Sequence, residues 1–399
     1  MTDVALHGAK MTQDAPSREE VLKVSGLKTY FRTRRGVVKA VDGASFTVAK
    51  GETLGVVGES GSGKSITSLS ILGLLPQPVG RIEEGRIEFC GEDLVTKSAA
   101  EMRRIRGKRI SMILQDPMTS LNPVLTIGDQ LTEPLRQHRK LTSKAAWSKA
   151  AELLSKVHIP SPGRRLHQYP HEMSGGMRQR VVSAIGLSCE PELLIADEPT
   201  TALDVTIQAQ VLELLRDLQN ELQFAMIFIT HDLDEALRIG DRIAILKDGK
   251  LVQTGAPVEI LLNPADDYVE AFVKDVNRAR AVPVKTIMQH AVPVIHATSL
   301  SDALAQLPSQ GYAFYEIQSK FQGIITRKKL QEALKLRPDG AITTAEITKI
   351  PSVMPDMLLQ EAISDALISR YSLPVLDEQG HCIGELSQEN LAETLEYIS

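Results

Sequence analysis

Apolar residues recur at different spacings along this chain, and the spacing divides it into regions. Residues 1–20 are polar and predict a polar tail. Short apolar runs beyond this tail predict an antiparallel β subdomain, with strands at residues 21–24, 37–41 and 44–48. Further strands are predicted at residues 54–57, 109–114, 193–196 and 225–229. The last two runs are continuously apolar, which is typical of a parallel sheet covered on both faces.

Helical patterns alternate with these strands. Residues 66–75 predict a helix that ends at Pro76, and a mainly helical region extends over residues 127–159. The helix predicted at residues 206–222 lies between two apolar strands, so the three elements form a βαβ unit. The chain is therefore expected to have an α/β fold.

The character of the chain changes near residues 278–283, and the remainder contains an internal repeat. Each copy is predicted to run roughly β-α-β-β-α. A copy of this size is too small to bury a good core alone, and pairing the two copies would solve that problem.

A glycine-rich loop follows the strand predicted at residues 54–57. Its sequence, GESGSGKS, fits the pattern G-x-x-x-x-G-K-[ST] of a phosphate-binding loop placed between a strand and a helix. Glycines let backbone N–H groups approach a phosphate at the positive end of the helix. Lys64 would reach the β- and γ-phosphates, and the Ser65 hydroxyl would ligate Mg²⁺. The predicted nucleotide contacts in the loop are Gly58, Ser60, Gly61, Ser62, Gly63, Lys64 and Ser65.

Polar residues stand at the carboxyl ends of three predicted strands, the edge at which open α/β sheets bind ligands. Asp197 would hold Mg²⁺ directly or through water, and Glu198 would polarise the attacking water as a general base. His231 would contact the γ-phosphate and help to position Glu198. Gln115 would sense Mg²⁺ and the water.

A second glycine-rich turn lies at residues 173–177, before a helix that begins near Arg178. Ser174 is a good N-cap, and Gly175 and Gly176 leave N–H groups free for an anion. Because the first loop already holds one side of the γ-phosphate, we expect this turn to serve the nucleotide of another protomer.

Composition limits the alternatives. The 399 residues suggest two or three domains, and a net charge of −5 gives no sign of a nucleic-acid partner. Three widely spaced cysteines fit a reducing cytoplasm. The polar beginning of the chain gives no sign of a signal peptide, and no apolar run approaches the roughly 20 residues that span a bilayer. If the protein serves a membrane, we expect it to act from the surface through a partner.

The order of these motifs over residues 21–275 resembles that of the ATPase subunit of ABC transporters. Residues 58–65 look like the Walker A loop, Gln115 like the Q-loop glutamine and His231 like the switch histidine. Residues 193–198 look like the Walker B strand with its catalytic glutamate. The turn at 173–177 looks like the signature motif, with Met173 in place of the usual Leu and Met177 in place of the usual Gln. Residues 202–204 look like the D-loop, which ends at Asp204.

The resemblance implies a P-loop NTPase fold of ABC type, with a mixed sheet core, the antiparallel β subdomain and a helical subdomain at about residues 116–180, all within residues 21–280. It implies a head-to-tail dimer that sandwiches two ATP molecules with Mg²⁺. It implies membrane permease subunits and, through them, a periplasmic or extracellular substrate-binding protein. The chain would be cytoplasmic, on the inner face of the cell membrane. Tyr30 or Phe31 would stack on adenine, and the spacing does not decide which.

Residues 281–399 resemble a tandem pair of CBS domains, at about 284–336 and 345–397, a small α+β regulatory module. Many such pairs bind adenine nucleotides through an aspartate, but Lys329 and Asn390 occupy the corresponding positions here. The basic residues of this region suggest an alternative, an anionic membrane surface bound in a salt-dependent way. This basic patch consists of Arg327, Lys328, Lys329, Lys335 and Arg337.

Two parts of the sequence suggest different cargoes. The motifs at residues 59–64, 115–123, 173–180 and 196–204 resemble those of oligopeptide and dipeptide importers. Residues 234–238, 247–250 and 264–276, with the CBS pair, resemble glycine betaine, proline and choline importers. We give more weight to the accessory domain and expect osmolyte uptake, with peptide uptake as the alternative. A soluble, non-transport ABC ATPase is disfavoured because no long coiled-coil insertion or second ATPase domain is present. A regulator with little turnover is disfavoured by Glu198 and His231.

Overall fold

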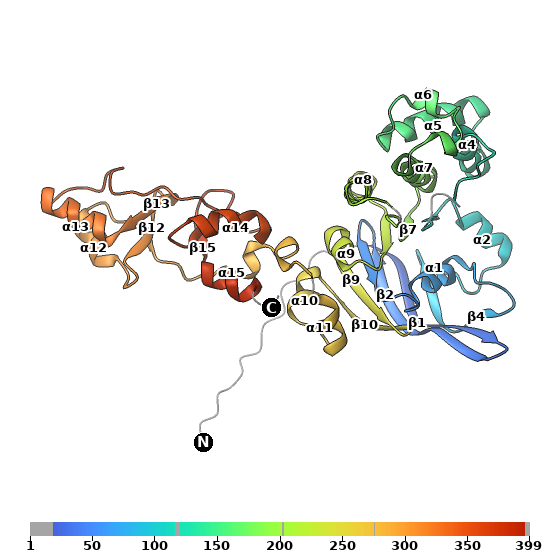
Figure 1. Ribbon diagram of the computed structural model, residues 1–399, viewed down its shortest axis with the longest axis horizontal. Coiled ribbons are helices and arrows are strands. Elements are labelled where there is room, and N and C mark those ends of the chain that lie inside the picture. Colours follow the sequence, from blue (N-terminus) through green and yellow to red (C-terminus); the bar gives the residue numbers. More distant parts are fainter. Residues whose placement is uncertain (1–18, 116–119, 202, 275, 396–399) are drawn as a thin grey trace, which may run out of the picture. The chain divides into compact units, whose positions relative to one another are not determined.

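The computed structural model describes residues 19–115, 120–201, 203–274 and 276–395. These residues form two compact units, one ending at Ala256 and the other starting at Pro257 (Figure 1). Helices α10 (Pro257–Leu262) and α11 (Asp267–Val273) therefore fall in the second unit, ahead of the boundary that the sequence suggests at 280/281. The domain limits 1–20, 21–280 and 281–399 remain a prediction.

A four-stranded antiparallel sheet begins the first unit. Its order is β2-β1-β4-β5, from β1 (Glu20–Thr33), β2 (Gly36–Ala49), β4 (Gly80–Phe89) and β5 (Glu92–Asp93). The two strands predicted at 37–41 and 44–48 are one strand, β2. Leu27 lies opposite Ala44 and Lys28 opposite Asp42, so Gly43, at φ +98°, is an extra residue in a β-bulge. The Asp-Gly pair therefore marks a bulge within the strand rather than its end.

A six-stranded mixed sheet forms the centre of the same unit. Its order is β10-β9-β3-β8-β7-β6, and every neighbouring pair is parallel except β10 and β9. The strands are β3 (Thr53–Val57), β6 (Ile110–Ile113), β7 (Leu193–Asp197), β8 (Ala225–Ile229), β9 (Arg242–Lys247) and β10 (Lys250–Gly255). The carboxyl ends of β6, β7, β8 and β3 therefore lie along one edge.

The continuously apolar strands are buried on both faces. Successive residues of β7 and β8 point to opposite sides, as the pleat requires. Leu194 and Phe228 belong to a core shared with the helical region, and Ile195 and Ile227 belong to a core shared with the antiparallel sheet. The predicted α/β class is confirmed, because a parallel sheet with both faces covered is its defining feature.

Helices follow most of the strands. The first, α1, ends at Leu72, where Gly73 adopts the left-handed conformation and its N–H bonds the Leu69 and Ser70 carbonyls, so the predicted end at Pro76 is wrong.

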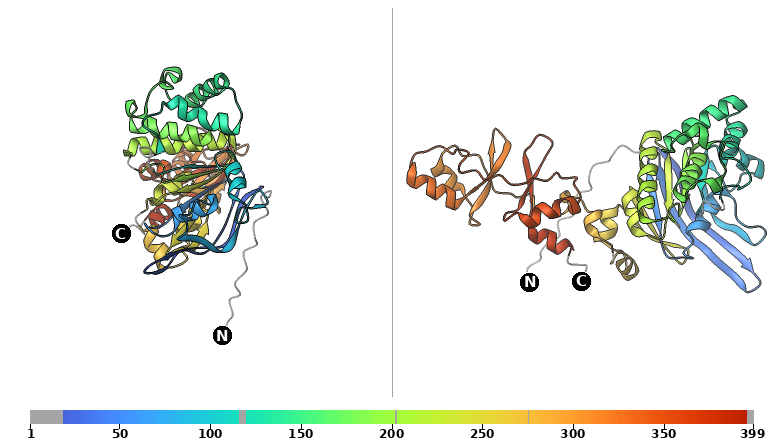
Figure 2. Two further views of the ribbon diagram at one scale, coloured as in Figure 1. Left: turned by 90° about the vertical axis from the view of Figure 1, so that its right-hand side faces the viewer. Right: turned by 45° about the horizontal axis from the view of Figure 1, so that its top comes forward.

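Helices between residues 127 and 165 form a group apart from the sheets (Figures 1 and 2). The helices of the first unit are α1 (Lys64–Leu72), α2 (Ala99–Ile105), α4 (Ile127–His138), α5 (Ser143–Lys156), α6 (Pro162–Arg165), α7 (Gly175–Leu187), α8 (Val205–Leu222) and α9 (Leu233–Ile239), with a 3₁₀ turn, η1, at Pro170–Glu172.

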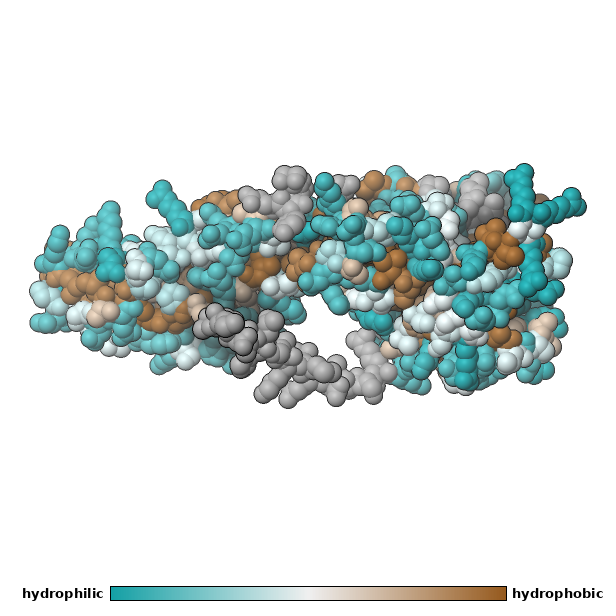
Figure 3. Space-filling model, turned by 90° about the horizontal axis from the view of Figure 1, so that it is seen from below, coloured by the Kyte–Doolittle hydropathy of each residue, from teal (hydrophilic) through white to brown (hydrophobic). Residues whose placement is uncertain are grey.

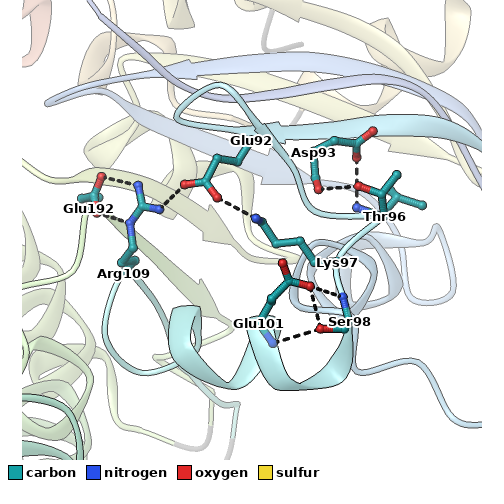
Figure 4. A network of polar contacts seen from close by, with 9 residues as sticks. Glu92, Asp93, Thr96, Lys97, Ser98, Glu101, Arg109 and Glu192 are labelled. Atoms are coloured by element: carbon teal, nitrogen blue, oxygen red, sulfur yellow. Dashed lines mark hydrogen bonds and ion pairs between the residues drawn. The ribbon is translucent and has the colours of Figure 1, made fainter.

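One arginine joins the two sheets of the first unit (Figure 4). Arg109, just before β6, donates to both carboxylate oxygens of Glu192, at 2.6 and 3.1 Å, and to Glu92 of β5 at 2.7 Å. Its guanidinium also lies 4.7 Å from the centre of the Phe89 ring. These bonds lower the pKa of the Glu192 carboxyl, chiefly through the hydrogen bond from Arg109. Arg109 thus ties the antiparallel sheet to the amino-terminal edge of the mixed sheet.

We expect Arg109→Met to lower the free energy of unfolding by about 1–2 kcal/mol, because two carboxylates lose their charge-assisted donor. The loss should be present near neutral pH and should shrink as the pH falls through the lowered pKa of Glu192. Urea unfolding at several pH values measures it. Arg104→Met, on an exposed position of α2, is the control and should change stability by less than about 0.5 kcal/mol. Equal losses in the two variants would contradict the prediction.

The second unit contains the two predicted repeat copies. The first runs β-α-β-β-α, and in the second the initial strand is reduced to one parallel bridge between Val353 and Val375. The first copy comprises β11 (Val294–Ile295), α12 (Leu300–Gln306), β12 (Tyr312–Ile317), β13 (Lys320–Thr326) and α13 (Arg327–Leu336). The second comprises α14 (Leu359–Ile368), β14 (Leu373–Leu376), β15 (Cys382–Leu386) and α15 (Gln388–Leu395). Two 3₁₀ turns precede both copies, η2 (Arg278–Arg280) and η3 (Val284–Thr286).

The two copies exchange backbone hydrogen bonds. Gln289, ahead of the first copy's strands, pairs with Glu385 of β15 through two bonds of 2.9 Å. Val284 N–H donates to the Met357 carbonyl at 2.8 Å, and the Asn390 side chain donates to the Ile287 carbonyl at 2.7 Å. The segment leading into the first copy is therefore held by the second.

Within the described ranges, we find no helix with the length and apolar character needed to cross a membrane. On the face shown in Figure 3, hydrophobic residues occur as separate patches among hydrophilic ones.

Candidate functional site

The phosphate loop connects β3 to α1 in a conformation that requires glycine at two positions. Gly58 has φ +153°, and a Cβ there would lie 2.2 Å from the Leu246 carbonyl oxygen. Gly63 has φ +102°, and its Cβ would lie 2.3 Å from the Ala40 carbonyl oxygen. Gly63 caps α1 without a side-chain bond, so the first N–H groups of the helix face the loop. This is the backbone arrangement that binds a phosphate.

Two side chains of the loop also suit an anion. Lys64 is buried, and its Nζ donates to the Gly58 and Glu59 carbonyls at 2.6 and 3.0 Å. Burial lowers the pKa of Lys64, while Glu198 and Asp197 act in the opposite direction. The Ser62 hydroxyl is buried and has no hydrogen-bond partner among the residues that the structure describes. A buried ammonium, an unpartnered hydroxyl and uncapped helix amides together fit a polyphosphate.

A carboxylate and a hydroxyl meet beside the loop. Ser65 Oγ donates to Asp197 Oδ1 at 3.2 Å, and only 7% of Asp197 is exposed. Burial raises the pKa of Asp197, and the bond from Ser65 partly opposes that shift. Oxygen ligands of this kind are those that Mg²⁺ prefers, together with phosphate oxygens and water. The pair therefore fits a magnesium ion carried with a nucleotide.

Two strand-end residues converge on a carboxylate oxygen of a third. Gln115 Nε2 donates to Glu198 Oε2 at 2.7 Å, and His231 Nδ1 lies 3.6 Å from the same oxygen. Glu198 follows β7 directly with φ +45°, an unusual conformation for a residue with a side chain. Strain of this kind is commonly found at functional sites. The structure thus brings together Gln115, Glu198 and His231, which the sequence places at the ends of β6, β7 and β8.

Glu198 has a further partner that the sequence does not predict. Thr201 Oγ1 donates to Glu198 Oε2 at 3.1 Å, and Thr201 N–H bonds the Glu198 carbonyl at 3.2 Å. The two residues close a turn, and a threonine three positions after the glutamate is the only sequence signal for it.

The second glycine turn lies elsewhere in the same unit. Ser174 caps α7 and accepts from Met177 N–H at 3.4 Å, and Asp204 caps α8 and accepts from Ile207 N–H at 3.0 Å. A Cβ on Gly176 would lie 2.8 Å from the Ile207 side chain, so the two helix starts adjoin. Across the described ranges, no hydrogen bond or ion pair joins Ser174, Gly175 or Gly176 to the phosphate loop. Ala202 and residues 116–119, which belong to predicted motifs, lie outside the described residues.

The two aromatic candidates for adenine stacking lie next to each other on β1 with different partners. The Tyr30 hydroxyl donates to Asp42 at 2.5 Å, a bond that raises the pKa of Tyr30 to about 12. Lys39 Nζ lies 5.4 Å from the centre of the Tyr30 ring. Phe31 packs against Gly80.

In the second unit, internal contacts involve both residues that replace the nucleotide-binding aspartate. Lys329 Nζ donates to the Ala345 carbonyl at 3.3 Å, and the Asn390 amide bonds Ser387, Gln289 and Ile287. Three of the five basic-patch residues are similarly engaged. Arg327 donates to the Pro308 carbonyl, and Arg337 pairs with Glu346 at 2.6 Å although it is exposed. Lys328 and Lys335 are exposed as well.

We expect Asp197→Asn to raise the melting temperature by about 2–4 °C at neutral pH in the absence of Mg²⁺. Asparagine keeps an oxygen for Ser65 and removes a buried charge. Because the folded-state pKa of Asp197 is raised, the ionised carboxylate costs stability above that pKa, and the gain should vanish below about pH 4. Thermal melts without Mg²⁺–ATP measure this gain in melting temperature. Melts with Mg²⁺–ATP should show a second effect, because the variant should lose the stabilisation that the bound metal gives to the wild-type protein. Asp204→Asn, which can still cap α8, is the control. A lower melting temperature for Asp197→Asn would contradict the prediction.

Comparisons with known proteins identify two matching regions. The model of the ABC transporter family matches residues 41–201, and that of the CBS domain matches residues 344–397. The second predicted CBS copy thus has a direct match, and the first stays a prediction.

Two similar sequences come from Bacillus subtilis (strain 168). The dipeptide transport ATP-binding protein DppD is 51% identical over 271 residues, which cover 67% of this chain and 81% of that protein. The oligopeptide transport ATP-binding protein OppD is 53% identical over 248 residues, or 62% of this chain and 69% of that protein. Among solved structures, the dimeric ATP-binding cassette MJ0796 bound to ADP and phosphate superposes with a TM-score of 0.53 and 26% identity, covering 59% of this chain and 98% of that one.

Proposed function

Since this chain belongs to the ABC transporter family, as the ATP-hydrolysing subunit of an importer, we propose that it powers the uptake of dipeptides or oligopeptides. The proposal rests on the similarity to DppD, in which 51% of the aligned residues are identical and the alignment covers 81% of the DppD sequence. Peptide uptake was the alternative in the sequence analysis, where the CBS tail favoured glycine betaine, proline or choline. The CBS match at residues 344–397 is compatible with either cargo, whereas the similar ATPase sequences are those of peptide transporters.

The proposed chemistry assigns each residue of the site a task. The loop amides, Ser62 and Lys64 bind the phosphates, and one phenyl or phenol ring of β1 stacks on the adenine. Ser65 and Asp197, with Gln115 nearby, would hold a magnesium ion, which would supply neutralisation of charge on the phosphates. Glu198 accepts a proton from the attacking water, which becomes a stronger nucleophile toward the γ-phosphorus. His231 contacts the γ-phosphate and fixes the position of Glu198 relative to it.

The proposed assembly is a head-to-tail dimer of ATPase subunits on the inner face of the cell membrane. Ser174, Gly175 and Gly176 of one subunit complete the site on the phosphate loop of the other, with Asp204 beside them. The exposed positions of the Ser174 turn and of Asp204 support this arrangement, because both helix caps are open to a partner.

We also propose a docking surface for the permease at the start of the helical region. Val124 is 76% exposed, and Leu114 and Leu125 are 48% and 39% exposed. Two neighbouring pockets along α4 are both lined by Leu125, Glu133 and Gln137. Exposed apolar side chains beside pockets are typical of a protein interface. A substrate-binding protein would join through the permease.

The CBS pair is proposed to regulate transport. Lys328, Lys335 and Arg337 are the exposed residues of the basic patch, and they would contact an anionic membrane surface. Such contacts weaken as salt screens the charges. Nucleotide binding at Lys329 or Asn390 has less support, because both side chains make internal hydrogen bonds.

Uptake assays test the cargo. Cells of the source organism lacking this chain should lose uptake of a labelled dipeptide and keep uptake of labelled glycine betaine. Wild-type protein expressed in these cells should restore dipeptide uptake, whereas Glu198→Gln at the same level should not. Loss of betaine uptake with normal dipeptide uptake would contradict the peptide proposal and support the osmolyte alternative.

A further inference from the structure

The loop that carries His231 is fastened on both sides of that residue by groups with no assigned role in the reaction. Thr230 Oγ1 donates to Glu235 Oε2 at 2.7 Å and accepts from Asp232 N–H at 3.0 Å. Asp232 in turn caps α9 and accepts from Asp234 N–H at 2.8 Å. Thr230 N–H also bonds the Val56 carbonyl of β3 at 3.1 Å. The backbone from 230 to 232 is therefore fixed at both ends.

Burial of the Thr230–Glu235 pair is the unusual part of this arrangement. Thr230 is 1% exposed and Glu235 is 7% exposed. An acidic side chain is rarely buried to this degree without a partner, and a buried carboxylate is costly unless it is hydrogen-bonded. Glu235 lies in the first turn of α9. The buried bond between Thr230 and Glu235 therefore fixes the backbone directly ahead of His231.

His231 itself has few restraints. Its side chain is 64% exposed, and among the described residues it has one ion-pair contact, with Glu198 at 3.6 Å. The position of the imidazole is thus set mainly by the backbone that carries it, and that backbone is held by Thr230 and Asp232.

We propose that Glu235, acting through Thr230, is a positioning residue that sets the place of His231 relative to Glu198 and the γ-phosphate. This inference rests on the role proposed above for His231. A displacement of about 1 Å in a catalytic group can cost as much as 100-fold in rate, so a clamp on this loop affects turnover without touching the nucleotide.

A double-mutant cycle in the full-length protein tests the proposal. Glu235→Ala and Thr230→Val should each lower kcat for ATP hydrolysis roughly tenfold, with KM for ATP within about twofold of wild type. Thr230→Ser, which keeps the hydroxyl, should retain near wild-type turnover. In the His231→Ala background, adding Glu235→Ala should lower kcat no further, because the clamp no longer has a side chain to place.

Glu52→Ala is the matched control for a structural effect. Glu52 is a second buried glutamate of the same unit, 6% exposed, which accepts from Ala49 N–H at 2.6 Å and from Arg242 at 2.9 Å. Its loss should lower the melting temperature and show no coupling to His231. Thermal melts of every variant confirm that the folded protein is being assayed.

Each outcome decides one point. If His231→Ala is slow and Glu235→Ala lowers kcat by the same factor in both backgrounds, Glu235 acts independently and the inference is overturned. Unchanged kcat in Glu235→Ala alone would also overturn it. If His231→Ala retains wild-type turnover, the role proposed for His231 fails, and the inference fails with it.

Discussion

Glu198→Gln is expected to lower kcat for ATP hydrolysis by at least about 100-fold while ATP binding is retained. Glutamine has the same shape as glutamate and keeps a side-chain oxygen. That oxygen can still accept from the Gln115 amide and the Thr201 hydroxyl, which lie 2.7 and 3.1 Å from Glu198 Oε2 in the wild-type protein. It cannot take a proton from water, so the step that consumes ATP stops. A dimer closed on two ATP molecules should therefore accumulate, since nothing resets it. Phosphate release and the molar mass in solution with ATP measure the two effects.

Glu213→Gln is the matched control, because Glu213 is an exposed glutamate on α8. This variant should hydrolyse ATP at the wild-type rate and dissociate after turnover. Normal turnover in Glu198→Gln would remove Glu198 from the mechanism. Slow turnover without a longer-lived dimer would support the role of Glu198 in hydrolysis and contradict the expectation that hydrolysis is needed to open the dimer.

Mixing two inactive variants should restore activity if the site is shared between subunits. Lys64→Met disables the phosphate loop, and Ser174→Arg blocks the second glycine turn with a large cation. Each variant alone should retain less than about 1% of wild-type activity. In a mixed dimer one composite site is doubly damaged and the other is intact, so an equal mixture should recover up to about a quarter of the wild-type rate.

The alternative arrangement, in which one subunit supplies both motifs, predicts no recovery. Mass analysis must show that mixed dimers form, because absent pairing would also give no recovery. A control mixture of Lys64→Met with Glu198→Gln cannot restore a site fully, since both residues lie on the same side of it. Recovery there equal to that of the first mixture would contradict the assignment of Ser174 to the partner's nucleotide.

The strand-end residues of the site could be foreseen because parallel strands impose a simple geometry. Gln115, Glu198 and His231 each follow an apolar run, and adjacent parallel strands must present such residues along one edge. The glycine pattern of the phosphate loop likewise reflects backbone constraints that the sequence carries directly. These features depend on local pattern and on sheet direction alone.

Other features depend on contacts that no local pattern reveals. Strand β4 alternates charged residues with only a few apolar ones, so its pairing with β1 is visible only when the partner is known. The role of Thr230 depends on a carboxylate five positions away becoming buried. Arg327 and Arg337 look like part of a continuous basic patch in the sequence, yet tertiary partners engage both. A sequence predicts that polar residues of this kind are exposed on average. Which of them gain tertiary partners depends on the fold.

The exchange of hydrogen bonds in the second unit has a consequence for how that unit can be divided. Gln289 belongs to the lead-in of the first copy but pairs with β15 of the second, and Val284 is bonded to Met357. A protease that cut the exposed stretch around Pro338 would sever the chain without releasing two pieces, because each fragment holds a segment that the other needs. The two copies are thus held together by hydrogen bonds between their segments, and a gene truncated between them would encode an incomplete unit.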